Sequence, residues 1–117
     1  MIQESSPMSL EVERRGDVLL VIIHGRMGEL EAQQLQRELL ALVDQGSVKL
    51  VVDLTDVPFV TSTSLGALMV AHKRVRARDG YLRVAGAQPL VRQILEITKL
   101  TKLFGNYPSA EAALSAK

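Results

Sequence analysis

The sequence predicts an α/β fold in which a mixed β-sheet of about four to five strands is covered by about four helices. The chain has 117 residues and 47% of them are hydrophobic, which suits one domain with one core. Short apolar segments rich in β-branched residues alternate with segments whose apolar residues recur every three or four positions. Alternation of these two periods along a chain is typical of strands and helices packed in layers.

The first predicted elements are two strands joined by a tight turn. Residues 10–14 alternate apolar and charged side chains, as expected for a strand with one buried face. Gly16 and Asp17 supply turn chemistry just before the apolar segment 18–24. These segments together predict a β-hairpin.

Two helices and a strand are expected next. Over residues 30–45 the apolar side chains recur at helical spacing. Residues 49–54 are short, apolar and rich in β-branched side chains, which is typical of a buried strand, and Pro58 prevents its continuation. A second helix is predicted over residues 62–78, because Gly80 supplies an end to the helical pattern.

The last third of the chain predicts one more strand and two helices. Residues 81–85 have strand composition. Pro89 is expected to open a third helix, because proline is well tolerated at the first helical position. Ser109 is a candidate cap for a short final helix over residues 110–116.

Composition and charge restrict the class of protein. Fourteen basic and thirteen acidic residues give a net charge of +1, which provides no electrostatic footprint for nucleic acid or a membrane surface. The chain has no cysteine, its polar start lacks the pattern of a signal peptide, and no apolar segment approaches the roughly 20 residues of a spanning helix. We expect a cytoplasmic monomer without direct nucleic-acid binding or membrane insertion, with a flexible N-terminus at residues 1–8 and one domain at residues 9–117.

The sequence offers no pattern for catalysis. His24 and His72 are the only histidines, and neither has a carboxylate or a second ligand at metal-binding spacing. No glycine loop of the Walker type and no nucleophile motif is present. We therefore expect a protein that is not an enzyme and that has no cofactor or metal ion.

A basic segment, His72 to Arg78, has two interpretations. Cations in the last turns of a helix complement the negative end of the helix dipole. The same side chains also suit contact with an acidic partner. The sequence leaves both open.

Four consecutive hydroxyl side chains, at residues 61–64, stand where the second helix is predicted to begin. Serine and threonine accept hydrogen bonds from the free amides of a first helical turn, so capping explains one or two of the four. A phosphate on such a hydroxyl also meets the free amides and the positive end of the helix dipole. The segment therefore suits either a structural cap or a phosphorylation site.

Residues 51–86, VVDLTDVPFVTSTSLGALMVAHKRVRARDGYLRVAG, resemble the core of the STAS domain. That family pattern has a hydrophobic strand ending in aspartate, an apolar pair, the motif Asp-Ser-Ser-Gly-Leu-Gly and a helix. Phe59 and Val60 match the apolar pair, and residues 61–66 match the motif. Residues 25–39 and 89–114 are similar to the upstream and final segments of the family, so the resemblance covers residues 10–114.

The resemblance implies an anti-sigma-factor antagonist that binds an anti-sigma factor acting also as a serine protein kinase. Phosphorylation in the loop before the second helix ends the binding, and a serine phosphatase resets it. Carried onto this chain, the phosphoacceptor is Ser62, with Thr63 as the second candidate. The surface implied for the partner comprises Gly28, Glu29, Phe59, Thr61, Ser62, Thr63, Ser64 and Leu65.

The chain departs from the family pattern at three positions. Thr61 stands in place of the motif aspartate, Gly28 in place of the upstream aspartate, and Ser64 in place of a glycine. Both acidic groups that flank the phosphoacceptor in the family are therefore replaced. The resemblance also implies an alternative function, namely a STAS subunit of a transporter or signalling assembly that acts as a docking module without phosphorylation.

Overall fold

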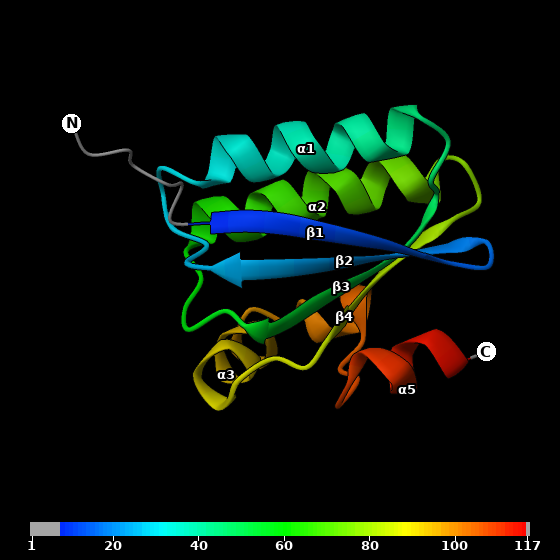
Figure 1. Cartoon of the computed structure of the whole chain (residues 1–117). Helices are drawn as coiled ribbons and strands as arrows, with labels where there is room; N and C mark the ends of the chain where they lie inside the picture. The colour runs from blue at the N-terminus through cyan, green and yellow to red at the C-terminus, as the bar shows by residue number, and fades with distance from the viewer. Residues whose placement is uncertain (1–7, 117) are drawn as a thin grey trace.

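A computed structural model describes residues 8–116 and shows one mixed four-stranded sheet (Figure 1). The strands follow the order β1-β2-β3-β4. β1 and β2 form the predicted antiparallel hairpin, and β3 and β4 add to β2 in parallel. The strands are β1 (Met8–Arg15), β2 (Val18–Gly25), β3 (Lys49–Asp56) and β4 (Tyr81–Ala85).

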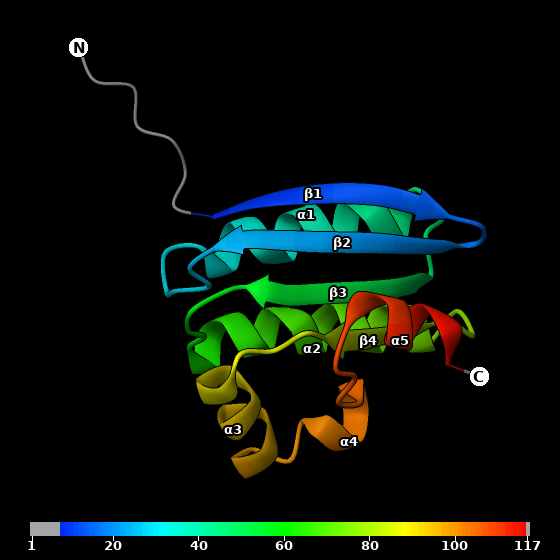
Figure 2. The same cartoon turned by 60° about the horizontal axis from the view of Figure 1, so that its bottom comes forward.

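The helices cover the two faces of the sheet unequally. Helices α1 and α2 lie side by side over one face, and the short α5 lies over the other face near β3 and β4 (Figure 2). The remaining helices, α3 and α4, lie on the β4 side of the molecule. The bounds are α1 (Ala32–Asp44), α2 (Ser62–Arg76), α3 (Pro89–Ile97), α4 (Thr101–Phe104) and α5 (Ala110–Ser115).

Strand alternation divides the apolar side chains between these two layers. Leu19, Val21 and Ile23 of β2 belong to the main core, which the inner faces of α1 and α2 complete. Val18 and Leu20, on the opposite face, belong to a smaller core beneath α5. Because both faces are covered at the middle of β3, its consecutive residues Leu50, Val51 and Val52 are all buried, as is typical of parallel strands between two layers.

The structure confirms the predicted α/β fold class, with four strands and five helices within residues 8–116. The sequence places Met8 in a flexible N-terminus, whereas Met8 begins β1 and is fully buried, because its side chain packs into the main core. Residues 1–7 and 117 lie outside the described residues. The additional helix, α4, has four residues, too few for an apolar period to mark it.

Three helices differ slightly from their predicted bounds, and the last of them, α5, ends at Ser115 instead of residue 116. The first begins at Ala32 instead of residue 30, and the second ends at Arg76 instead of residue 78. Asp79 has a φ of 61°, and the Gly80 amide donates to the Val75 carbonyl oxygen at 2.8 Å. This left-handed residue turns the chain out of the helix before Gly80, as in other helix C-terminal motifs.

Candidate functional site

Two loops meet at the carboxyl ends of β2 and β3. The Met27 amide donates to the Phe59 carbonyl oxygen at 3.4 Å, and Met27 and Val60 form an isolated parallel bridge. Met27 is fully buried and Val60 nearly so. The bridge holds the loop that leads from β2 into α1 against the loop that leads from β3 into α2. Residues 28 and 29 therefore lie beside the start of α2, although they precede it by more than thirty positions.

A reciprocal pair of hydrogen bonds caps the start of α2. Thr61 is the N-cap residue, and its Oγ1 accepts from the Ser64 amide at 3.2 Å. The Ser64 Oγ accepts from the Thr61 amide at 2.9 Å and donates to the Thr61 carbonyl oxygen at the same distance. Ser64 is fully buried. This is a capping box in which serine takes the place of the usual Glu or Gln.

The other two hydroxyl side chains of the run are exposed. The Thr63 Oγ1 donates to the Glu29 Oε1 at 2.7 Å. Within residues 8–116 the Ser62 hydroxyl makes no hydrogen bond, and no acidic residue occupies the first turn of α2. The fold therefore uses the hydroxyls of Thr61 and Ser64 and leaves that of Ser62 at the positive end of the helix dipole.

Gly28 lies against a buried carboxylate. Its amide donates to the Glu31 Oε1 at 3.0 Å, and Glu31 is only 8% exposed. A Cβ atom at position 28 would stand 2.5 Å from that oxygen. An aspartate here would displace the Glu31 carboxylate and bring a second negative charge beside it. Glycine at position 28 thus leaves room for the Glu31 carboxylate to accept from its amide.

Sequence reasoning places eight residues on a partner surface, and the structure divides them. Gly28, Glu29, Phe59, Thr61, Ser62 and Thr63 lie together at the junction of the two loops, whereas the side chains of Ser64 and Leu65 are buried. Sequence reasoning missed Leu30, which is 90% exposed between Glu29 and Glu31. An apolar residue in a turn before a helix is the signal that marks it.

A three-residue ionic cluster lies near this end of the sheet. The His24 Nδ1 is 2.7 Å from the Asp56 Oδ2, and its Nε2 is 2.9 Å from the Glu11 Oε1. The hydrogen bond to Asp56 raises the pKa of His24 above 6.5, and the hydrogen bond to Glu11 adds to this effect.

The other histidine, His72, behaves in the opposite way. Burial lowers the pKa of His72 below 6.5, and the nearby charge of Arg76 adds to this effect.

The basic segment at the end of α2 performs several structural tasks. Arg74 and Arg78 approach the Asp44 Oδ1 at 3.0 and 3.5 Å, which ties the end of α2 to the end of α1. Arg76 donates to the Gly80 carbonyl oxygen at 3.2 Å. Independently of these contacts, the last turn of α2 is basic, as the dipole interpretation expects. Contact of the segment with an acidic partner stays a prediction.

Residues 8–116 were also searched for a membrane-spanning helix and for a metal-binding cluster. No helix in this range combines the length and apolar character needed to cross a membrane. No group of three or more histidine, cysteine, aspartate or glutamate side chains in the same range is arranged to hold a metal ion.

The family model of the STAS domain matches residues 9–113, so the chain belongs to the STAS domain family. The Bordetella bronchiseptica protein called "Putative anti-sigma factor antagonist BtrV" is 30% identical over 109 residues, which cover 93% of this chain and 94% of that protein. The crystal structure of an anti-sigma factor antagonist from Mycobacterium paratuberculosis has a TM-score of 0.84 and 28% identity, covering 96% of this chain and 97% of that one. The resemblance stated from the sequence is confirmed.

The anti-sigma factor antagonist SpoIIAA has the same fold. Its unphosphorylated form has a TM-score of 0.76 and 15% identity, covering 90% of this chain and 93% of that one. The phosphorylated form of the Bacillus protein has a TM-score of 0.71 and 14% identity, covering 93% of this chain and all of that one. At these identities the likeness shows the fold alone.

The capping geometry predicts different effects for neighbouring hydroxyls. Thr61→Ala removes the acceptor for the Ser64 amide and is expected to lower the free energy of unfolding by about 1 kcal/mol. Ser62→Ala removes no hydrogen bond and is expected to change it by less than about 0.5 kcal/mol. Urea unfolding of the two variants beside the wild type measures both. An equal loss in the two variants would contradict the assignment of Thr61 as the cap.

The two histidines are expected to give stability opposite dependences on pH. The raised pKa of His24 means that its contribution is fully present below pH 6.5 and is lost as pH rises through the higher folded-state value. The lowered pKa of His72 means that stability falls as pH drops below 6.5. Urea midpoints of the wild type, His24→Gln and His72→Gln are measured from pH 5 to pH 8 in steps of about half a unit.

His24→Gln should make stability rise more steeply with pH than in the wild type, and His72→Gln should make it fall more steeply. The slope is the readout, because either substitution can also shift stability equally at every pH. Parallel curves for the wild type and His24→Gln would contradict the ionic cluster.

Proposed function

We propose that this chain is an anti-sigma factor antagonist that binds an anti-sigma factor with serine kinase activity and is switched by phosphorylation of Ser62. Its membership of the STAS domain family and the name of its Bordetella relative support the antagonist function. The observation that carries the switch is the exposed Ser62 hydroxyl at the start of α2, which the fold does not use. The proposed activity is binding by a single chain, without catalysis.

Ser62 is the best phosphoacceptor of the four hydroxyls. Phosphorylation of Thr61 or Ser64 would break the capping box, and Ser64 is inaccessible. Phosphorylation of Thr63 would replace its hydrogen bond to Glu29 with repulsion between a phosphate and a carboxylate. A phosphate on Ser62 would meet the amides of the first helical turn without losing an existing contact.

Glu29 supplies an acidic group in a site where both family aspartates are replaced. Its Oε1 lies 2.7 Å from the Thr63 Oγ1 and therefore close to the start of α2. We infer that this carboxylate helps the kinase to recognise the loop. At position 28, the acidic position of the family, an aspartate would have to displace the Glu31 carboxylate that now accepts from the Gly28 amide.

The surface proposed for the partner combines apolar and polar groups. Leu30 is almost fully exposed, and Pro58 and Phe59 present further apolar surface on the adjoining loop. Ser62 and Glu29 supply polar groups among them. A phosphate adds about −1.5 to −2 charges to this surface. Removing water from the charged phosphate at a closed interface is unfavourable, so phosphorylation releases the partner. A serine phosphatase restores binding by removing the phosphate.

We expect Ser62→Asp to weaken partner binding by at least about tenfold, because about 1.4 kcal/mol suffices for that factor and an unpaired interfacial charge can cost several kcal/mol. Ser62→Ala should bind like the wild type. The partner is first recovered by capture on the immobilised chain from cells of its own organism and identified by mass spectrometry. Its affinity for each purified variant is then measured by calorimetry.

Ser109→Asp is the matched control. Ser109 is an exposed serine at the start of α5, on the opposite face of the sheet, and aspartate caps a helix as well as serine does. The Ser109→Asp variant should bind the partner with the affinity of the wild type. An unchanged affinity of Ser62→Asp would contradict the switch at this residue. Capture of transporter components in place of a histidine-kinase-like ATPase would contradict the antagonist function.

A further inference from the structure

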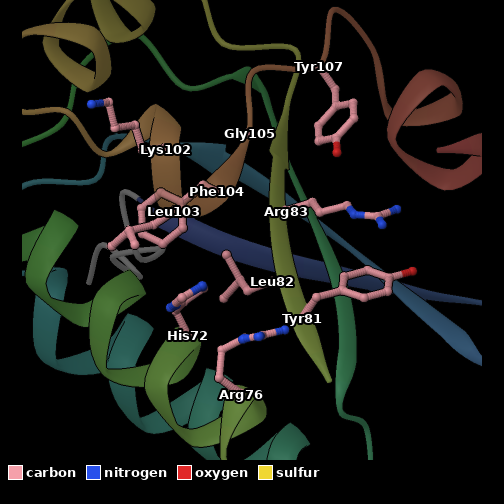
Figure 3. A pocket seen from close by; sticks show the side chains of 10 residues that line it. All are labelled: His72, Arg76, Tyr81, Leu82, Arg83, Lys102, Leu103, Phe104, Gly105 and Tyr107. Carbon is pink, nitrogen blue, oxygen red and sulfur yellow. The ribbon is translucent and has the colours of Figure 1, made fainter. Parts of the chain in front are cut away.

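The β1 strand is an open edge of the sheet, on the side opposite β4. It stands last in the strand order, and no strand within residues 8–116 pairs with its outer side (Figure 2). The β4 edge is partly covered, because the Tyr107 amide donates to the Val84 carbonyl oxygen at 3.4 Å. Figure 3 shows the segment that carries Gly105 and Tyr107 alongside β4. The edge of β1 therefore offers main-chain groups to another chain.

The turn after β1 decides which of its main-chain groups face outward. The register pairs Arg15 with Val18 across a two-residue turn, and Gly16 in that turn has a φ of 64°. The residues that flank such a turn exchange hydrogen bonds, and the pattern then alternates along the hairpin. The main-chain groups of every second residue before Arg15 therefore point to β2. Those of Leu10 and Val12 point to the outer edge.

A groove of about 280 Å³ adjoins this edge on the side of α1. Leu10, Val12, Ala41 and Leu42 give it apolar walls, and Glu38 is the one charged residue among its described lining residues. Val12 is 50% exposed. A strand added to β1 would direct alternate side chains into this groove and the others away from it.

Glu38 brings a negative charge to the groove without a cation beside it. Its Oε2 accepts a hydrogen bond from a neutral side-chain amide at 2.8 Å, and it forms no ion pair within residues 8–116. The two acids of β1 itself are paired, Glu11 with His24 and Glu13 with Arg15. The groove therefore favours a ligand that places a cation near an apolar side chain.

The charges of β1 disfavour a second copy of this chain as the occupant of the edge. Antiparallel pairing of two β1 strands, with both sets of helices on one side of the sheet, can be centred on Glu11, Val12 or Glu13. These registers place Glu11 opposite Glu11, Glu11 opposite Glu13, and Glu13 opposite Glu13, respectively. Like charges directly opposite each other destabilise a sheet. A different chain with a basic side chain avoids this repulsion.

We propose that the β1 edge binds an extended segment of a partner protein, in which an apolar and a basic side chain stand two positions apart. The segment adds to β1 as an antiparallel strand and hydrogen-bonds with the outward main-chain groups. The apolar side chain lies against Ala41 and Leu42, and the basic side chain reaches Glu38. In strand addition the main chain supplies affinity and the side-chain pockets supply specificity. The proposal does not depend on the switch at Ser62.

The probe is the blocked heptapeptide acetyl-Thr-Val-Thr-Lys-Thr-Val-Thr-amide, whose valines and lysine share one face of a strand. Its binding to the full chain is followed by NMR. The peptide should bind saturably, with a dissociation constant of about 1 mM or lower. It should shift the amide signals of Leu10 and Val12 and leave that of Leu82, on the β4 edge, in place.

Two N-methylated forms of the peptide test the main-chain pairing. In antiparallel addition, the peptide residues that face the groove also direct their amides to β1. N-methylation of the lysine should therefore weaken binding by at least about tenfold. N-methylation of the threonine before it, whose amide faces away from β1, is the matched control and should leave the affinity unchanged. An equal loss with both peptides would contradict strand addition.

Substitutions of Glu38 test the charge in the groove. Glu38→Gln should weaken binding of the lysine peptide by about threefold. Glu38→Lys should bind the peptide with glutamate in place of lysine more tightly than the lysine peptide. Glu96→Gln is the matched control, because it removes an exposed, unpaired carboxylate from α3, outside the groove. It should bind like the wild type, and thermal melts verify that each variant is folded.

Three results would overturn the proposal. The first is the absence of saturable binding. The second is equal weakening by Glu38→Gln and Glu96→Gln, which indicates charge attraction without a site. The third is a dependence of the Leu10 and Val12 signals on protein concentration in the absence of peptide, which indicates that a second copy occupies the edge.

Discussion

The parallel bridge between Met27 and Val60 is the contact on which the candidate site depends. The bridge joins two loops that follow neighbouring parallel strands. Met27 and Val60 are buried at the base of these loops, whereas residues at the loop tips, such as Leu30, are exposed. Without the bridge, Glu29 would have no fixed position relative to Thr63, 34 residues away in sequence. Because main-chain atoms and buried apolar side chains make the bridge, the residues at the loop tips are free to differ without loss of the fold.

Capping then divides a run of chemically similar hydroxyls into two kinds. The first turn of a helix leaves amides without partners, and Thr61 and Ser64 satisfy this requirement reciprocally. Helical geometry directs the side chain at position 64 inward and the one at position 62 outward. In the proposed function, stability and regulation use different hydroxyls, so that a change at Ser62 would alter binding while the helix start stays intact.

The sequence predicted the main elements of the sheet and its helices because their periods are local. It failed at Met8, whose burial depends on the core around it, and at α4, which is too short to show a period. It grouped most of the candidate site by resemblance to a family. It could not assign the cap among four hydroxyls or find the contact of Glu31 with Gly28, because both depend on the exact backbone path of the loops.

We propose that the fold leaves Ser62 available for modification while Thr61 and Ser64 hold the helix start. The most direct test incubates the wild-type chain with the captured kinase and ATP and locates the phosphate by fragmentation mass spectrometry. We expect one phosphate on the wild-type chain, on Ser62, and none on the Ser62→Ala variant. Phosphate on Thr61 or Ser64 of the folded wild-type chain would contradict it.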